Sequence, residues 1–360
     1  MSFSFSFSGD DIEGDNDSVE DIAGKLQDAS LQQDSSSLAP QLHALKDLLY
    51  TLPSQISYNA VSIYDDRRES DQSSCNILRR SLFDIRQQLM VEADPTQDND
   101  ETHNLLNGLD TGDLNSGIYE GGFKTWECAL DLAKFVTGQN CLVDDSAGDE
   151  DLHIVELGAG SAIPSLALIL RFMQLPKQYR KVIFTVCDYN EPVLRLCTVA
   201  NILLTVLLAD GSSLTDALAQ GDDQELDITS EVVDRCLKTL EKACIEITLV
   251  SGSWGADFVK LIKDQRSSCA SQRCLVLASE TIYDTHNLGT FARTVLDLID
   301  GSSKSAAYVA AKKMYFGVGG GIEEFELSLG RAGGHLRLCE DVKGASVGRG
   351  IWKVSTDSEV

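Results

Sequence analysis

The sequence predicts an α/β protein with a largely parallel central sheet and an N-terminal extension. From Gly121 onward, short apolar runs alternate with amphipathic helical segments, a pattern typical of repeated βαβ units. One apolar run, His153–Leu157, leads directly into a glycine-rich turn and then into a helix, as in α/β folds that bind nucleotides. The 360 residues are enough for one large domain with an extension.

The expected elements of the main domain, residues 116–360, follow from apolar runs bounded by glycine and polar residues. The predicted strands are His153–Leu157, Val182–Cys187, Ile247–Val250, Cys274–Ser279, Ala306–Ala311, Leu336–Cys339 and Ile351–Val354. The predicted helices are Glu127–Val136, Ile163–Phe172, a segment that follows Asp188 and ends at about Leu208, and Asn287–Leu298. The polar stretch 209–246 reads as an acidic insertion with a helical patch at Val232–Ala243.

The N-terminal third is predicted to contain a tail, a packed extension and a linker. Residues 1–37 are rich in serine and aspartate and cannot bury enough apolar surface to offset their ordering entropy, so we expect a disordered acidic tail. Its Ser-Phe repeat, Ser2–Ser8, fits a strand or docking peptide as well as a flexible end. Residues 38–115 form the extension and an acidic linker (93–115), with a helix at Leu42–Leu52, a strand at Ile56–Ile63 and a helix at Ile77–Met90.

The formal net charge is −26, with 56 acidic against 30 basic residues. Such a surface repels phosphate backbones, so direct nucleic-acid binding is disfavoured. The same charge would attract a basic protein, although the acidity is equally explained as a means of solubility.

Ten cysteines are scattered without a C-x-x-C pair, and several lie in apolar segments: Cys128, Cys187, Cys197 and Cys339. We expect reduced, buried thiols and no metal site. Because no secretion signal and no run of about 18 apolar residues is visible, we expect a cytoplasmic or nuclear protein without a membrane span. Nothing in the chain indicates more than a monomer.

The strongest local motif runs from Val155 to Pro164. Gly158 and Gly160 allow a sharp turn and a close approach of the backbone to a ligand. Glu156 precedes the first glycine, and Asp188 follows the next strand, where a carboxylate can accept hydrogen bonds from ribose hydroxyls. A dinucleotide-binding turn would have a third glycine where Ala162 stands. The residues therefore favour a methyltransferase over a dinucleotide enzyme, with a domain that binds nothing there as the remaining alternative.

Five blocks, in order along the chain, resemble the histidine protein methyltransferase family, and they cover roughly residues 118–326. They are Tyr119–Cys128, Cys187–Asn190, Ser251–Trp254, Ser279–Tyr283 and Tyr315–Gly321. The opening Met1–Phe5 resembles the fungal members. The resemblance implies the seven-stranded, Rossmann-like class I methyltransferase fold and S-adenosylmethionine as the cofactor.

The resemblance also implies roles for individual residues. Those expected to bind the cofactor are Thr125, Trp126, Glu127, Cys128 and Ala129 at its methionine end, Glu156, Gly158 and Gly160 beneath it, Asp188, Tyr189 and Asn190 at the ribose, Gly252, Ser253 and Trp254 at the adenine, and Ser279 closing the site. Trp126 and Trp254 fit equally as core aromatics. Ala162 and Ser253 depart from the family, which often has glycine and an acidic residue there.

The segment Glu280–Tyr283 is expected to face the substrate. Transfer to histidine needs an acceptor for one ring N–H, so that the other nitrogen presents its lone pair, and Glu280 and Asp284 are the candidates. Asp284 is equally suited to cap the following helix, with His286 a solvated residue of that turn. Tyr283 and the glycines Gly317, Gly319, Gly320 and Gly321 are predicted to contact the substrate through a flexible loop, or else to form a plain hairpin turn.

The resemblance predicts an enzyme that methylates the tele nitrogen of a histidine on the third large-subunit ribosomal protein, a basic partner. Two alternatives remain at this stage. One is lysine methylation on the same fold, which requires deprotonation of an amine with a pKa of about 10.4. The other is a non-catalytic protein that keeps the fold and only binds a basic partner.

Overall fold

The computed structural model describes residues 38–63, 75–93, 102, 105–106, 108–109, 121–138, 150–174, 179–211, 214, 223–265, 272–300, 304–315, 319–343 and 347–356. The predicted acidic tail, nearly all of the acidic linker and Gly317 lie outside these residues, so those predictions stay untested. The residues from Leu38 onward form one compact unit.

A central sheet of eight strands runs through the described part of the chain, in the order β1-β7-β5-β4-β8-β9-β11-β10. Its parallel core is β7 (Ile245–Ser251), β5 (Lys181–Asp188), β4 (Asp151–Leu157), β8 (Gln272–Ser279) and β9 (Ala306–Lys312). The antiparallel strands are β1 (Gln41–Ala44), β11 (Arg349–Ser355) and β10 (His335–Val342). The predicted α/β class and all seven predicted strands are confirmed, and the eighth strand, β1, comes from the N-terminal extension.

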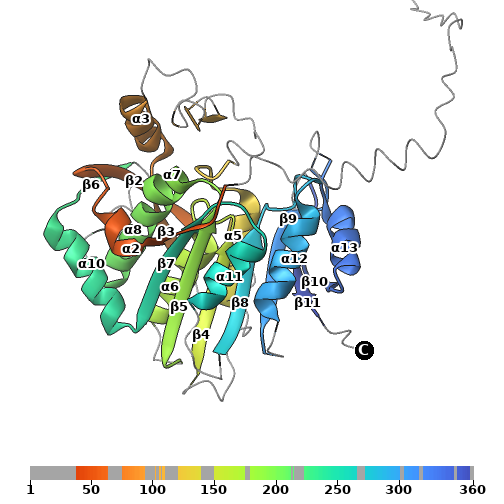
Figure 1. The fold of residues 1–360 in the computed structure, drawn as a ribbon. Coiled ribbons are helices and arrows are strands. Elements are labelled where there is room, and N and C mark those ends of the chain that lie inside the picture. The colour runs from red at the N-terminus through yellow and green to blue at the C-terminus, as the bar shows by residue number, and fades with distance from the viewer. Residues whose placement is uncertain are drawn as a thin grey trace, which may run out of the picture. The chain divides into compact units, whose positions relative to one another are not determined.

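Helices cover both faces of this sheet (Figure 1). The first face carries α5 (Glu127–Gly138), α6 (Ile163–Gln174) and α8 (Val199–Ala209), and the second carries α11 (Ala256–Asp264), α12 (Leu288–Ile299) and α13 (Ile322–Arg331). Alternation along β4 explains why both faces are filled. Leu152 and Ile154 pack into the first core, whereas Val155 and Leu157 pack into the second.

One apolar helical stretch follows β5. It consists of α7 (Glu191–Val193), a π-helical segment (Leu194–Thr198) and α8. The stretch Glu191–Ala209 is long and apolar enough to cross a membrane, but most of it is buried in the protein, as expected for a core helix. Thr198, the last residue of the π-helical segment, donates a hydrogen bond from Oγ1 to Gly160 O at 2.6 Å. This bond joins the helical stretch to the turn after β4.

The predictions for the N-terminal extension were partly wrong. The segment predicted as one helix over Leu42–Leu52 begins as β1 and continues as a short helix, α2 (Leu45–Leu49). The segment predicted as a helix over Ile77–Met90 is a strand, β3 (Cys75–Arg80), followed by α3 (Leu82–Glu92). In both cases pairing with another strand determines the structure, since β1 pairs with β7 and β3 pairs with β2, and periodicity within the segment cannot reveal such pairing.

The predicted strand at Ile56–Ile63 is present as β2 (Gln55–Ile63), the centre of a second sheet with the order β3-β2-β6. Its third strand, β6 (Gln224–Asp227), lies in the stretch predicted to be an acidic insertion, as does α10 (Ser230–Lys242). The extension and the insertion therefore build one small antiparallel sheet, and its apolar residues join the first core.

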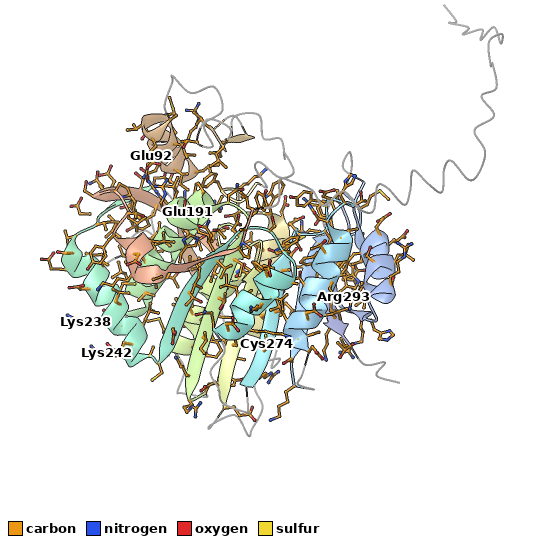
Figure 2. The ribbon with its side chains drawn as sticks, viewed as in Figure 1. Glu92, Glu191, Lys238, Lys242, Cys274 and Arg293 are labelled. Carbon is orange, nitrogen blue, oxygen red and sulfur yellow. The ribbon has the colours of Figure 1, made fainter. Side chains whose placement is uncertain are left out.

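Arg80 ties this small sheet to the helices beside it. Its guanidinium is almost fully buried and donates to Asp84 Oδ2 at 2.6 Å, to Gln88 Oε1 at 2.7 Å and to Leu196 O at 2.9 Å. A second arginine, Arg195, lies nearby, with contacts to Glu92 of α3 (2.7 Å) and to Glu191 of α7 (3.9 Å). Figure 2 labels both glutamates, on neighbouring elements.

Candidate active site

Most of the predicted cofactor residues lie at or just after the carboxyl ends of β4, β5, β7 and β8, which share one edge of the parallel sheet (Figure 1). This is the edge at which open α/β sheets bind ligands. Thr125–Ala129 instead lie at the start of α5, and the predicted substrate glycines follow β9.

The turn after β4 is held by close backbone contacts. Gly158 and Gly160 have φ values of +61° and +51°, which favour glycine. A Cβ on Gly160 would lie 2.6 Å from Gly122 O, so the segment before α5 crosses directly over the turn. Ala162 also has a positive φ, +58°. The family's frequent glycine at this position therefore has a conformational reason, and the alanine here adopts a strained backbone.

Asp188 organises the glycine turn. Its Oδ2 accepts a hydrogen bond from Gly160 N at 2.8 Å, and its Oδ1 accepts one from Asn190 N at 3.2 Å. Burial raises the pKa of Asp188 to about 6, although these backbone donors oppose that effect. Each carboxylate oxygen can accept more than one hydrogen bond, so the group can still receive ligand hydroxyls.

Glu156 is buried beside the start of α6. Its Oε2 accepts a hydrogen bond from Ser165 N at 2.9 Å, which satisfies one of the free N–H groups at the helix N-terminus. Burial raises the pKa of Glu156 to about 7. Its Oε1 is buried and has no hydrogen-bond partner among the described residues. The side chain thus supports the turn and offers one oxygen to a donor.

The loop after β7 is covered by the first described residues of the chain, a contact that the sequence reasoning missed. Gly252 N donates to Tyr189 O at 3.1 Å, and Ser253 N donates to Leu38 O at 2.9 Å. A Cβ on Gly252 would lie 2.8 Å from Ala39 O. The Leu38–Pro40 segment therefore closes over the loop predicted to hold the adenine.

The two predicted cofactor tryptophans lie in different settings. The ring of Trp254 packs on Phe291 with a centroid distance of 4.9 Å, so it belongs partly to the second core. Trp126 donates from Nε1 to Gly121 O at 3.1 Å. The Nζ atoms of Lys124 and Lys312 lie 4.6 Å and 5.2 Å from the centroid of its ring.

The other residues predicted at the methionine end divide between surface and core. Thr125 donates to Ser161 Oγ at 3.0 Å, which joins this segment to the glycine turn. Glu127 begins α5 with an exposed side chain, whereas Cys128 and Ala129 are buried in the first core. Burial raises the pKa of the Cys128 thiol.

Of the cysteines predicted to be buried, Cys187 and Cys197 are buried like Cys128, and Cys339 is half-buried. All seven cysteines whose side chains are described carry free thiols.

Glu280 follows Ser279 at the end of β8 and has the unusual φ of +58°. Only 9% of the residue is exposed. Tyr315 Oη donates to Glu280 Oε2 at 2.6 Å, and Lys312 Nζ lies 3.5 Å from Oε1. A non-glycine residue in this backbone region costs about 1–3 kcal/mol and is found most often at functional sites. This supports a functional role for Glu280.

Asp284 instead makes local contacts. Its Oδ1 accepts from His286 N at 3.0 Å and lies 3.0 Å from His286 Nδ1, and its Oδ2 accepts from Asn287 Nδ2 at 3.1 Å. These bonds stabilise the turn before α12. The N-cap of α12 is Asn287, which makes no side-chain cap hydrogen bond, so Asp284 stabilises the turn without capping the helix, and its orienting role stays a prediction. The His286 side chain is 92% exposed, as expected for a solvated turn residue.

Of the described glycines in the predicted substrate loop, Gly320 and Gly321 are buried against backbone, whereas Gly319 is exposed and has no atom within 4 Å of the position that a Cβ would take. The predicted flexibility of the loop stays a prediction. Gly319 forms an isolated antiparallel β-bridge with Asp284, and Gly320 N donates a hydrogen bond to Tyr283 O at 3.0 Å. A Cβ on Gly320 would overlap with Tyr283 O, and one on Gly321 would lie 2.9 Å from Lys313 O. These glycines therefore allow two backbone segments to touch beside Glu280. Their contact with a substrate stays a prediction.

The residues fit a polar, donor-rich ligand. Buried oxygens without a hydrogen-bond partner among the described residues include Glu156 Oε1, Thr281 Oγ1 and Glu280 Oε1, the last of which lies 3.5 Å from Lys312 Nζ. Thr281 also lies against the turn, since its Cγ2 is 2.8 Å from where a Cβ on Gly158 would stand. Unpaired buried acceptors are costly, so ammonium or hydroxyl donors of a ligand would stabilise them. Among the described residues, no group of three or more His, Cys, Asp or Glu side chains is arranged to hold a metal ion.

Comparison with known proteins assigns the family. No family model matches the chain. Histidine protein methyltransferase 1 of Saccharomyces cerevisiae is 37% identical over 263 residues, which cover 70% of this chain and 68% of that protein. The chain belongs to the histidine protein methyltransferase family. The Schizosaccharomyces pombe protein of the same name is 31% identical over 297 residues, or 81% of this chain and 78% of its own length. The prediction made from the five sequence blocks is thus confirmed, and this member of the histidine protein methyltransferases is an enzyme of the methyltransferase class.

Solved structures give only a distant likeness to this member of the family. The rRNA methyltransferase AviRa from Streptomyces viridochromogenes has a TM-score of 0.34 and 10% identity, covering 64% of this chain and 88% of that one. Magnesium protoporphyrin IX methyltransferase from Synechocystis has a TM-score of 0.31 and 13% identity, covering 76% and 93%. No conclusion is drawn from scores of this size.

Proposed function

We propose that the protein transfers a methyl group from S-adenosylmethionine to the tele nitrogen of a histidine in a basic protein, a large-subunit ribosomal protein. One observation carries the proposal: Asp188, the glycine turn and the strained Glu280 converge at the carboxyl edge of the sheet in a member of the histidine protein methyltransferase family. Residence in the cytoplasm or nucleus and a monomeric state are part of the same proposal.

The residues that would bind the cofactor are those that offer hydrogen-bond acceptors or open backbone at this edge of the sheet. When bound, S-adenosylmethionine supplies the electrophilic methyl group, carried on a sulfonium. Asp188 would accept the ribose hydroxyls, and Glu156 Oε1 would accept a donor beneath the turn. Gly158 and Gly160 would allow close approach of the backbone, with Trp254 beside them at 4.0 Å from where a Cβ on Gly158 would stand.

Glu280 would orient the target ring. A histidine side chain has a reference pKa of about 6.5, so much of it is neutral at pH 7 and no strong base is needed to create the nucleophile. Glu280 Oε1, which has no hydrogen-bond partner among the described residues, would accept the N–H of one ring nitrogen. The other nitrogen then presents its lone pair to the methyl carbon. After methyl transfer to that nitrogen, Glu280 would take up the proton of the ring N–H that it holds, which returns the methylated ring to its neutral form.

The substrate class is supported by charge. A net charge of −26 attracts basic proteins from a distance and repels RNA, so a basic protein is a better partner than the nucleic acid it binds.

The test combines the purified protein, methyl-labelled S-adenosylmethionine and ribosomal proteins from cells that lack this protein. We expect label on a single histidine of one large-subunit protein, located by mass spectrometry. Asp188→Ala should abolish labelling, whereas Asp210→Ala, a surface change at the Arg235 ion pair, should not. Label on lysine would refute the histidine assignment. Cofactor binding without label on any ribosomal protein would refute the ribosomal substrate and favour the non-catalytic alternative.

A further inference from the structure

The ammonium of Lys312, the last residue of β9, lies in a cage of two carboxylates and two aromatic rings beside Glu280. Its Nζ is 3.4 Å from Glu127 Oε2 and 3.5 Å from Glu280 Oε1. The same atom is 5.2 Å from the ring centroid of Trp126 and 5.9 Å from that of Tyr315. Carboxylates and π faces are the groups with which proteins bind an alkylammonium ion, including that of lysine.

We propose that Lys312 is a specificity-determining residue: its ammonium occupies the place that a substrate lysine would take, and so reserves the site for a neutral imidazole. This inference rests on the proposed function, because it explains how a site rich in carboxylates accepts histidine in preference to lysine.

The charges of the cage support the inference. Without Lys312, Glu127 and Glu280 would present two negative charges to an incoming substrate, an arrangement that favours an ammonium over a neutral ring. With Lys312 in place one of those charges is compensated, and Lys124 adds a second cation 4.6 Å from the Trp126 ring centroid. Burial alone lowers the pKa of Lys312, but the Glu280 and Glu127 carboxylates more than reverse this, so the internal cation persists at neutral pH.

The cage is partly open to solvent, which a specificity role requires. The Glu127 side chain is 58% exposed and the Lys312 side chain 20% exposed, whereas Glu280 at the inner end is only 7% exposed. A ligand that entered past Glu127 would therefore meet Lys312 before it reached Glu280. The hydrogen bond from Tyr315 Oη occupies Glu280 Oε2, which leaves Oε1 as the oxygen shared between Lys312 and a substrate.

The first experiment is chemical complementation in the full chain. Lys312→Ala removes the stem and ammonium of the side chain, and n-propylammonium replaces the missing atoms. We expect n-propylammonium to bind this variant at least about tenfold more tightly than the wild-type protein, measured as a concentration-dependent rise in Tm. Lys312→Arg keeps the cation and should show no gain. Lys313→Ala, which removes the partner of Asp341, should also behave as wild type.

The second experiment measures selectivity. Two peptides that differ only in histidine or lysine at the target position compete in the methylation assay. We expect the lysine peptide to inhibit Lys312→Ala at least about tenfold more strongly than it inhibits the wild-type protein. If Lys312→Ala does not fold, Lys312→Gln removes the charge with less loss of volume and is tested with the same two readouts.

Equal responses of Lys312→Ala and wild-type protein to n-propylammonium would overturn the inference, since a lysine with only a structural role would lower Tm without creating an amine site. The amine-binding readout needs no methyl transfer. If the variant binds the amine but the wild-type protein labels no histidine, the proposed function is rejected, whereas the role of the cage as an amine-binding site is still supported.

Discussion

Gly160→Ala probes the closest contact in the site, where the glycine turn passes under the segment before α5. The new Cβ would lie 2.6 Å from Gly122 O, and the residue would keep a φ of +51°. The left-handed backbone alone costs an alanine about 1–2 kcal/mol. Forcing a methyl group against backbone adds about 1–3 kcal/mol. We therefore expect a loss of about 2–5 kcal/mol in the free energy of unfolding, together with weaker binding of S-adenosylmethionine, because Gly160 N is a partner of Asp188.

A matched control separates the two contributions. Gly211 has a φ of +75°, but no atom lies within 4 Å of the position that a Cβ would take. Gly211→Ala should therefore lose only the backbone share, about 1–2 kcal/mol, and leave cofactor binding unchanged. Urea unfolding of the three proteins gives the stabilities, and calorimetric titration gives the affinities. If the two variants lose equal stability and bind the cofactor equally, the crossing of the turn by Gly122 is not a tight contact and the reasoning is refuted.

Three further predictions concern pH, a buried arginine and the strained alanine. Because ionised Asp188 is the form that accepts two hydroxyls, and its pKa is about 6, we expect the S-adenosylmethionine Kd to rise about tenfold per unit well below pH 6. The unliganded protein should instead lose stability as the pH rises from about 4 to about 7, since burial raises the pKa of Asp188 to about 6 and that of Glu156 to about 7, and folding favours their protonated forms. Arg80→Ala should cost about 3–5 kcal/mol in urea unfolding, because it leaves the buried Leu196 O without its donor and the half-buried Asp84 without its cation. Ala162→Gly should change stability by less than about 1 kcal/mol, because relief of the φ of +58° offsets the lost methyl burial.

Each of these predictions has a contradicting result. A Kd that is flat from pH 5 to pH 8 would mean that Asp188 does not titrate in the binding equilibrium. Arg235→Ala, at a surface ion pair, should cost about 0–1 kcal/mol in the free energy of unfolding. An equal loss for Arg80→Ala would mean that the buried hydrogen bonds of Arg80 do not stabilise the fold. A large loss for Ala162→Gly would mean that packing of the methyl group outweighs backbone strain.

The parallel strands of the main sheet could be predicted because each is an apolar run bounded by polar or glycine residues. By contrast, β1 has no apolar alternation of its own, and its strand conformation comes from pairing with β7. Helices α11 and α13 were also missed, since each is short and buries only two or three side chains.

In the site, Gly160 and Asp188 could be found because ligand-binding α/β sheets place such residues after fixed strands, whereas Glu280 was found only through the resemblance of its sequence block to the family. Two other parts left no signal in the sequence. Leu38 contributes a carbonyl oxygen, which any residue supplies, and Lys312 acts through neighbours on two other segments, at Glu127 and at Glu280.

The pairing of β1 with β7 has a consequence for how the chain reaches its folded state. His43 contacts Ser251 Oγ at 2.8 Å, and the two residues are 208 positions apart. During synthesis the N-terminal strand leaves the ribosome long before its partner exists, and it cannot dock until most of the domain has emerged. Since the same segment carries Leu38 onto the loop at Ser253, the nucleoside end of the site cannot form before β7 and that loop have been synthesised. A nascent or truncated chain that lacks one of these two segments would therefore have the glycine turn but an incomplete cofactor site, and we expect it to be inactive.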